Sequence, residues 1–152
     1  MNTDPFISDL MKEFESITSY STQTRVDDLG ELGDVEQLFI KATATLAFNR
    51  IPDAYTDHAS RDESTSSVWI LGALAHMRKN RGNLKRAKLS LRPGLLDNGE
   101  LFNPENQIKV LCSKLWVEIN AEIFKYDAMI VTYNTALWRH NIIEDNSKPL
   151  RF

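Results

Sequence analysis

The sequence predicts an all-α protein: a small bundle of about four helices, with one long C-terminal helix and extended termini. Apolar residues recur at spacings of three and four along most of the chain. Proline follows a capping residue at Asp4-Pro5 and again at Asn103-Pro104, which is typical of helix starts. Because 152 residues can bury a core without disulfides, we expect a single helical domain over residues 1–152.

The first helix is expected to start after Asp4, whose carboxylate can cap a helix that has Pro5 as its first residue. Its apolar stripe consists of Phe6, Ile7, Leu10, Met11, Phe14 and Ile17. Residues 18–33 are rich in Ser, Thr, Asp and Gly and predict a long loop. Residues 1–33 are therefore interpreted as an acidic N-terminal helix and loop that could pack on a partner.

A second helix is predicted from Asp34 to Asn49. Asp34 and Gln37 have the spacing of a capping box, and Ile51-Pro52 disfavours helical geometry beyond the predicted end. The following residues, 53–63, are expected to form a polar connection.

A third helix is predicted from Ser64. Residues 68–77 are apolar nearly all round, which indicates a central, buried helix. A strand is the alternative, but the alanine, glycine and methionine content favours a helix. Gly82-Asn83 is expected to interrupt this helix before a short basic continuation that stops at Pro93-Gly94. Around Asp97-Asn98-Gly99 a turn is predicted, with a short hairpin as a further alternative.

The last helix is predicted to run for about 38 residues from Pro104, or ~57 Å. Its apolar seam consists of Ile108, Leu111, Leu115, Ile119, Ile123, Tyr126, Ile130, Tyr133 and Leu137. This length exceeds the width of a 17.4 kDa globule, so the helix is expected to kink near residues 130–132 or to project toward a partner. Residues 144–152 are expected to be an extended tail, whose Leu150 and Phe152 suit docking in a partner's groove.

Charge is strongly segregated along the chain, although the net charge is only −3. Residues 1–36 contain nine acids and two bases, and residues 64–96 contain seven bases and no acid. The seven are Arg78, Lys79, Arg81, Lys85, Arg86, Lys88 and Arg92. Such asymmetry indicates electrostatic recognition of nucleic acid or of an acidic protein surface, which could be the chain's own N-terminal region.

No residue pattern predicts catalysis, a metal site or a cofactor. His58, His76 and His140 lack the spacing of metal ligands, and Cys112 lies beside the apolar seam, where thiols are usually inert. Glu118 and Glu122 are spaced like the carboxylates of helical-bundle metal sites, but the chain has no matching Glu-x-x-His motif. Two acids on a solvated helix face are the favoured interpretation, and the chain is expected not to be an enzyme.

These features favour a non-enzymatic assembly or adaptor protein that acts through protein–protein contacts within a larger complex, such as a viral or phage particle subunit or connector. Its expected partners are other protein subunits, in an oligomer or a hetero-complex. The alternative is a nucleic-acid-binding accessory protein that uses residues 78–92. A single cysteine and the lack of a signal sequence or a membrane-length apolar run favour a cytoplasmic location, or one within an assembled particle.

Overall fold

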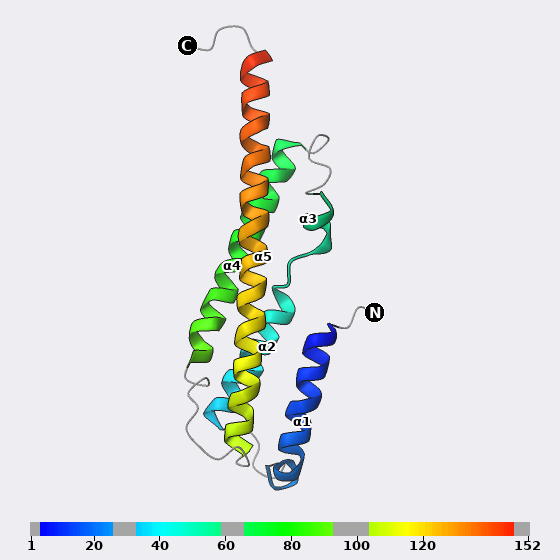
Figure 1. The fold of residues 1–152 in the computed structure, drawn as a ribbon, viewed down its shortest axis with the longest axis vertical. Helices are drawn as coiled ribbons and strands as arrows, with labels where there is room; N and C mark the ends of the chain where they lie inside the picture. The colour runs from blue at the N-terminus through cyan, green and yellow to red at the C-terminus, as the bar shows by residue number, and fades with distance from the viewer. Residues whose placement is uncertain (1–3, 26–32, 59–65, 93–103, 148–152) are drawn as a thin grey trace.

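The computed structural model describes residues 4–25, 33–58, 66–92 and 104–147. Within these ranges it has five helices and no strand: α1 (Pro5–Arg25), α2 (Asp34–Phe48), α3 (Asp53–His58), α4 (Ser67–Leu91) and α5 (Pro104–Ser147). Helix α5 runs the length of the elongated molecule, and α1, α2 and α4 pack along it (Figure 1). The predicted all-α bundle with a long C-terminal helix is confirmed.

The core lies where α5 meets the other three long helices. Of the nine seam residues predicted on α5, seven are buried, and Ile130 and Leu137 are partly buried against the same core. Phe14 of α1 stacks on Phe39 of α2 with ring centroids 4.9 Å apart. The spacing of apolar residues on α5 therefore identified its core face correctly.

Helix α1 starts as predicted but is longer. The Oδ1 atom of Asp4 accepts hydrogen bonds from the backbone N–H groups of Phe6 (3.1 Å) and Ile7 (3.3 Å), which is the expected N-cap. The loop predicted from residue 18 is wrong for residues 18–25, which are helical. After Pro5 no glycine or proline occurs before Gly30, so the polar segment has nothing to stop an established helix.

Helix α2 begins and ends close to the predicted residues, but Asp34 is not its cap. Gly33 is the N-cap and no side chain caps the helix, so the predicted capping box is wrong. Because the C=O of Gly33 already accepts from the N–H of Gln37 (3.0 Å), Asp34 falls inside the first turn, where the helix dipole favours its charge. The short helix α3 occupies part of the segment predicted as a polar connection.

Helix α4 starts at Ser67 with Ser66 as its cap and is continuous to Leu91. The predicted interruption at Gly82-Asn83 is wrong, because the penalty of about 1 kcal/mol for one helical glycine is smaller than the gain from burying neighbours such as Leu84. The helix is also not buried all round, since Val68 and Leu71 are exposed. The turn or hairpin predicted around residues 97–99 lies outside the described residues.

Helix α5 has 44 residues, which corresponds to ~66 Å, and it is continuous through residues 130–132, where a kink was one expectation. It also continues through residues 144–147, so the predicted start of the extended tail is wrong. The helix ends two residues before Pro149, which disfavours helical geometry in the residue before it. Leu150 and Phe152 lie outside the described residues. In the described helices, no segment is both long and apolar enough to span a membrane.

Candidate functional site

The face of α5 that points away from the core carries a stripe of exposed apolar side chains. Five large ones lie at intervals of seven residues: Val110 (39% exposed), Val117 (63%), Phe124 (64%), Val131 (65%) and Trp138 (63%). Three small exposed residues, Ala121, Ala128 and Thr135, each follow one of these after four residues. Alternating steps of four and three residues are the spacing of a coiled-coil seam. We call these eight residues the outward stripe.

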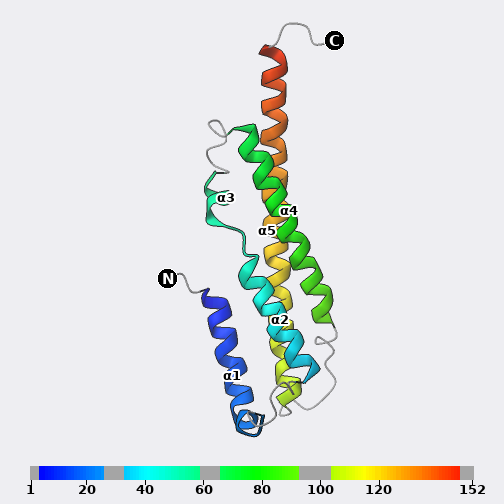
Figure 2. The ribbon, with the colours of Figure 1, turned by 180° about the vertical axis from the view of Figure 1, so that it is seen from behind.

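The outward stripe lies between two oppositely charged helices. In Figure 1, α2 and α4 cross behind α5, so that the C-terminal part of α4 lies on one side of α5 and α1 lies on the other; Figure 2 shows the reverse view. On the α1 side, Lys114 Nζ binds Glu13 Oε2 (3.1 Å). On the α4 side, Arg81 pairs with Asp127 and Lys88 Nζ donates to Asn120 Oδ1 (2.7 Å). The N-terminal part of the stripe therefore has an acidic helix along one edge and a basic helix along the other.

The seven basic residues singled out in the sequence all lie on α4 or at its C-cap. Three bind α5: Arg81 and Lys88 as described, and Arg78, which donates to Asn134 (3.3 Å). Lys88 also lies over the Trp116 ring, 4.6 Å from its centroid, and Arg86 binds Asn83 of its own helix. The remaining three, which are Lys79, Lys85 and Arg92, are exposed.

The described acids of α1 do not pair with this basic segment. Glu13 binds Lys114 and Asp4 binds Arg50, and α1 lies across α5 from α4 (Figure 1). Docking of the basic segment on the chain's own N-terminal helix is therefore wrong for the described residues.

Arg50 joins three carboxylates from α5 and from the cap of α1. Its guanidinium binds Asp4 Oδ2 (2.6 Å), Glu118 Oε2 (2.8 Å) and Glu122 Oε1 (2.8 Å). Burial lowers the pKa of Arg50, but the hydrogen bonds to the three carboxylates outweigh this effect and raise the pKa above its ordinary value. Burial raises the pKa of Asp4, but hydrogen bonds from Arg50 and from two backbone N–H groups outweigh this effect and hold the pKa below its ordinary value of 3.8.

The prediction that Glu118 and Glu122 lie on a solvated face is wrong. Glu122 is only 2% exposed, and its second oxygen accepts from the backbone N–H of Ile51 at 2.8 Å. Glu118 is partly buried against Arg50. Arg50, which lies 68 residues from Glu118 and 72 residues from Glu122 in the sequence, supplies the countercharge without which burial of these carboxylates would be strongly destabilising. Among the described residues, no group of three His, Cys, Asp or Glu side chains could hold a metal ion, and Asp4, Glu118 and Glu122 bind the Arg50 guanidinium.

A second polar group links the middle of the bundle. The Tyr126 hydroxyl donates to the backbone oxygen of Asn49 (2.7 Å) and accepts from Asn80 Nδ2 (3.1 Å). Burial raises the pKa of Tyr126 to about 12; the hydrogen bond from Asn80 acts against this rise, and the charges of Glu122 and Tyr55 add to it. Each buried hydroxyl and amide here has a partner, as a structural network requires.

Helix α3 is held by aromatic side chains. Tyr55 packs edge-on against Trp69, His76 and Tyr133, and its hydroxyl lies 2.6 Å from His76 Nδ1. The Tyr133 hydroxyl donates to the backbone oxygen of Tyr55 (2.5 Å). His76 of α4 thus helps to hold α3 in place. His140 is half-buried, and the side chain of His58 lies outside the described residues.

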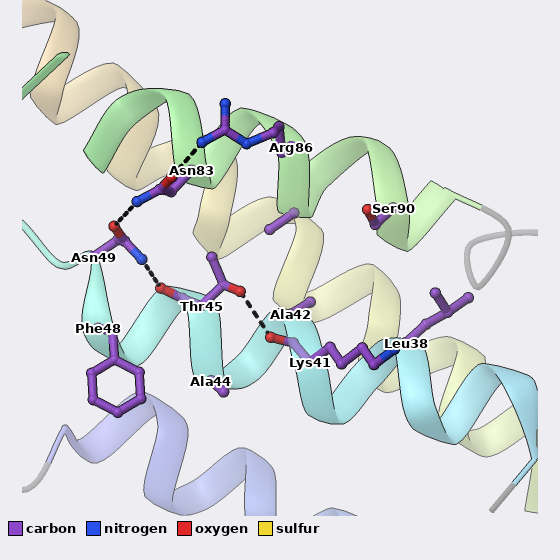
Figure 3. A pocket seen from close by; sticks show the side chains of 11 residues that line it. Leu38, Lys41, Ala42, Ala44, Thr45, Phe48, Asn49, Asn83, Arg86 and Ser90 are labelled. Carbon is purple, nitrogen blue, oxygen red and sulfur yellow. Dashed lines mark hydrogen bonds between the residues drawn. The ribbon is translucent and has the colours of Figure 1, made fainter. Parts of the chain in front are cut away.

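A groove of about 540 Å³ lies between α2 and α4 (Figure 3). Its polar wall is already hydrogen bonded internally: Asn83 donates to Asn49 Oδ1 (2.9 Å), and Asn49 donates to the backbone oxygen of Thr45 (2.7 Å). Arg86 binds Asn83, and Phe48 at one end is 86% exposed. The groove presents Lys41 and Arg86 but no pairing of a nucleophile with a base.

The Cys112 thiol is buried, and burial raises its pKa to about 12. A thiol in this environment stays protonated at neutral pH and is a poor nucleophile.

Comparison with protein-family models, with curated proteins and with solved structures gave no match. Inferences about function therefore rest on the geometry of the described residues.

Sequence reasoning missed the outward stripe, although its signature is present in the sequence. Valine, phenylalanine or tryptophan occurs at every seventh position from 110 to 138. The stripe became distinct only when the core-facing residues of α5 were known, because apolar residues on two opposite faces obscure each other's periodicity.

Proposed function

We propose that the chain is a non-enzymatic assembly or adaptor protein that acts through protein–protein contacts along the outward stripe of α5. The observation that carries the proposal is the stripe itself. Soluble monomers rarely expose contiguous apolar surfaces of this kind, and where such surfaces occur they mark interaction sites. Singly scattered exposed apolar residues need no explanation, but five at regular intervals do.

The form of the stripe favours a helical partner. From Val110 to Trp138 it extends for ~42 Å along one helix, and its spacing of four and three is that of knobs-into-holes packing. The opposite face of α5 is fixed by α1, α2 and α4, so the stripe is held straight before any partner binds. A preorganised surface reduces the entropy lost on association.

The state of the reactive groups also favours binding over catalysis. The thiol of Cys112 is protonated, the three carboxylates around Arg50 are engaged in ion pairs, and the Tyr126 hydroxyl both donates and accepts a hydrogen bond. The carboxylates and the Tyr126 hydroxyl serve to hold helices together.

The test is the native mass of the chain when it is isolated with an affinity tag from its source cells. We expect a complex heavier than the 17.4 kDa chain, and we expect Phe124→Glu to lose it. Phe48→Glu is the matched control, because Phe48 is more exposed than Phe124 and lies on α2, away from the stripe. A native mass of one chain for the unmodified protein, or a complex that survives Phe124→Glu, would contradict the proposal.

The alternative is a nucleic-acid-binding accessory protein. It is favoured by the exposed Lys79, Lys85 and Arg92, whereas Arg78, Arg81 and Lys88 are already engaged by α5. Three phosphate contacts predict a modest salt dependence, with a slope of about −3 in log affinity against log salt on duplex DNA. The measurement is the affinity for DNA and RNA over a series of salt concentrations. An affinity that follows this slope and that falls in the double variant Lys79→Ala, Lys85→Ala would support the alternative. An affinity that depends neither on salt nor on these two changes would dismiss the alternative.

A further inference from the structure

We infer that the partner on the outward stripe is a second copy of this chain, arranged in parallel, so that the acidic α1 of each copy faces the basic α4 of the other. This inference rests on the proposed function and names the partner. Three observations carry it: the charges on the two edges of the stripe, their level along α5, and the area that the stripe can bury.

The basic edge is a regular row. Arg78, Arg81, Lys85, Lys88 and Arg92 are separated by steps of three and four, so they follow one face of α4. The contacts of Arg78, Arg81 and Lys88 with α5 show that this face borders α5.

The acidic edge lies on α1. Asp9 and Glu13 are four residues apart, so they share a face of that helix, and the Glu13–Lys114 ion pair places this face beside α5. The α1 face beside α5 is therefore acidic and the α4 face is basic, although Lys114 and Asp127 of α5 already pair with Glu13 and Arg81.

The acidic edge lies level with the C-terminal part of the basic row, whereas Arg81 and Arg78 meet α5 further along, at Asp127 and Asn134. Glu13 pairs with Lys114, and Asp4 shares Arg50 with Glu118. On the opposite edge, Lys88 binds Asn120, within the same short stretch of α5.

These positions select one orientation of a symmetric dimer. A two-fold axis parallel to α5 exchanges the two edges and preserves their level, so α1 of one copy meets α4 of the other. A two-fold axis perpendicular to α5, in the plane of the interface, would place α4 opposite α4 and so oppose two basic rows. Opposite charges across an interface favour association and like charges disfavour it, so the parallel dimer is the favoured arrangement.

The stripe alone is too small for a standard interface, so a dimer would also need contacts between the two charged edges. A contact ~42 Å long and ~10 Å wide covers ~420 Å² on each copy, about half of the ~800 Å² per partner in a standard interface. Contacts between α1 and α4 across the interface would supply the rest. The exposed Ala121, Ala128 and Thr135 leave room for two α5 helices to approach between the larger side chains.

The first experiment measures the mass of the purified chain alone, by light scattering and by sedimentation over a dilution series. We expect twice 17.4 kDa at high concentration and one chain for Phe124→Glu, with the Phe48→Glu control still dimeric. Helix content from circular dichroism confirms that each variant is folded. A purified chain that stays monomeric at every concentration overturns the second-copy inference. If the purified chain is monomeric but the complex isolated from source cells still depends on Phe124, the second-copy inference fails and the proposed function stands.

The second experiment tests the orientation. Lys85→Glu should weaken a parallel dimer about threefold to tenfold, since two edge pairs change sign, and adding Asp9→Lys should restore it. Tightening of the dimer by Lys85→Glu alone would overturn the parallel arrangement, because it would show that α4 faces α4.

Cross-linking gives an independent measure of orientation. In a parallel dimer each stripe residue faces its own copy, so Val131→Cys should form a disulfide-linked dimer under mild oxidation. The native Cys112 does not interfere, because it is buried. Cross-linking that occurs only when Val117→Cys and Val131→Cys chains are mixed would instead show an antiparallel pair and overturn the inference.

Discussion

Replacing Arg50 with methionine removes the ion pairs through which one side chain joins Asp4, the cap of α1, to Glu118 and Glu122 of α5. Methionine keeps a similar apolar stem but leaves three carboxylates without the guanidinium, and one of them, Glu122, is 2% exposed. The variant therefore measures how much the Arg50 cluster stabilises the packing of α1 and α2 on α5.

The magnitude follows from the burial of each carboxylate. Removing one partner of a buried ion pair lowers stability by about 3–5 kcal/mol. Here Glu122 keeps the N–H of Ile51 at 2.8 Å and Lys125 at 3.5 Å, and Asp4 and Glu118 are about a quarter exposed, so solvent screens them. We therefore expect the free energy of unfolding to fall by about 2–4 kcal/mol. Changing Glu122 to glutamine in the same chain should recover about 1–2 kcal/mol, because no buried charge then remains unpaired.

Urea unfolding followed by circular dichroism gives these free energies by linear extrapolation. The control is Lys114→Met, which breaks an ion pair whose side chains are about half exposed and should change stability by no more than about 0.5 kcal/mol. The reasoning fails if Arg50→Met is as stable as the control, or if the double variant is no more stable than Arg50→Met alone.

Three further outcomes test particular groups. Burial raises the pKa of Tyr126 from 10.0 to about 12, so the phenol of the unfolded chain ionises first as the pH rises. The free energy of unfolding should therefore fall between about pH 10 and pH 12. Urea titrations at each pH should show a smaller fall for Tyr126→Phe. The thiol of Cys112, whose pKa burial raises to about 12, should react with a thiol reagent at neutral pH only when urea unfolds the chain; rapid reaction in the native state would contradict its burial. Gly82→Ala should raise stability by about 0.5–1 kcal/mol, because the added methyl group meets only Arg86 Nη1 at ordinary contact distance (3.7 Å), and a loss of stability in thermal or urea unfolding would refute this.

Local features of the fold were predictable from the sequence. The Asp4 cap, the extent of α2 and the core face of α5 each depend on residues within a few positions of one another. Helix continuity was less predictable, because a single glycine such as Gly82 has a penalty that buried neighbours can exceed, and those neighbours are known only from the tertiary structure.

The polar clusters could not be predicted in this way. Arg50 reaches Asp4, Glu118 and Glu122 across 46, 68 and 72 residues of sequence, and no local pattern marks the pairing. The i, i+4 spacing of the two glutamates gave only their common face; which helix covers that face decides whether they are solvated or paired. The contacts of the basic segment were also not predictable, because the position of α5 decides which of its side chains bind α5 and which face solvent.

The period of the outward stripe adds a geometric consequence to the proposed dimer. A repeat of seven residues falls about 20° short of two full turns of a straight α-helix, so the stripe drifts around α5 by ~80° between Val110 and Trp138. The drift runs from the α1 edge at Val110 toward the α4 edge at Trp138, the side on which Asp127 and Asn134 meet α4. A partner helix that follows the stripe must therefore cross α5 at about 20°, as in left-handed coiled coils. Two copies of α5 satisfy this condition together, because each carries the same drift, whereas a straight partner without a seven-residue repeat would leave contact with the stripe before reaching Trp138.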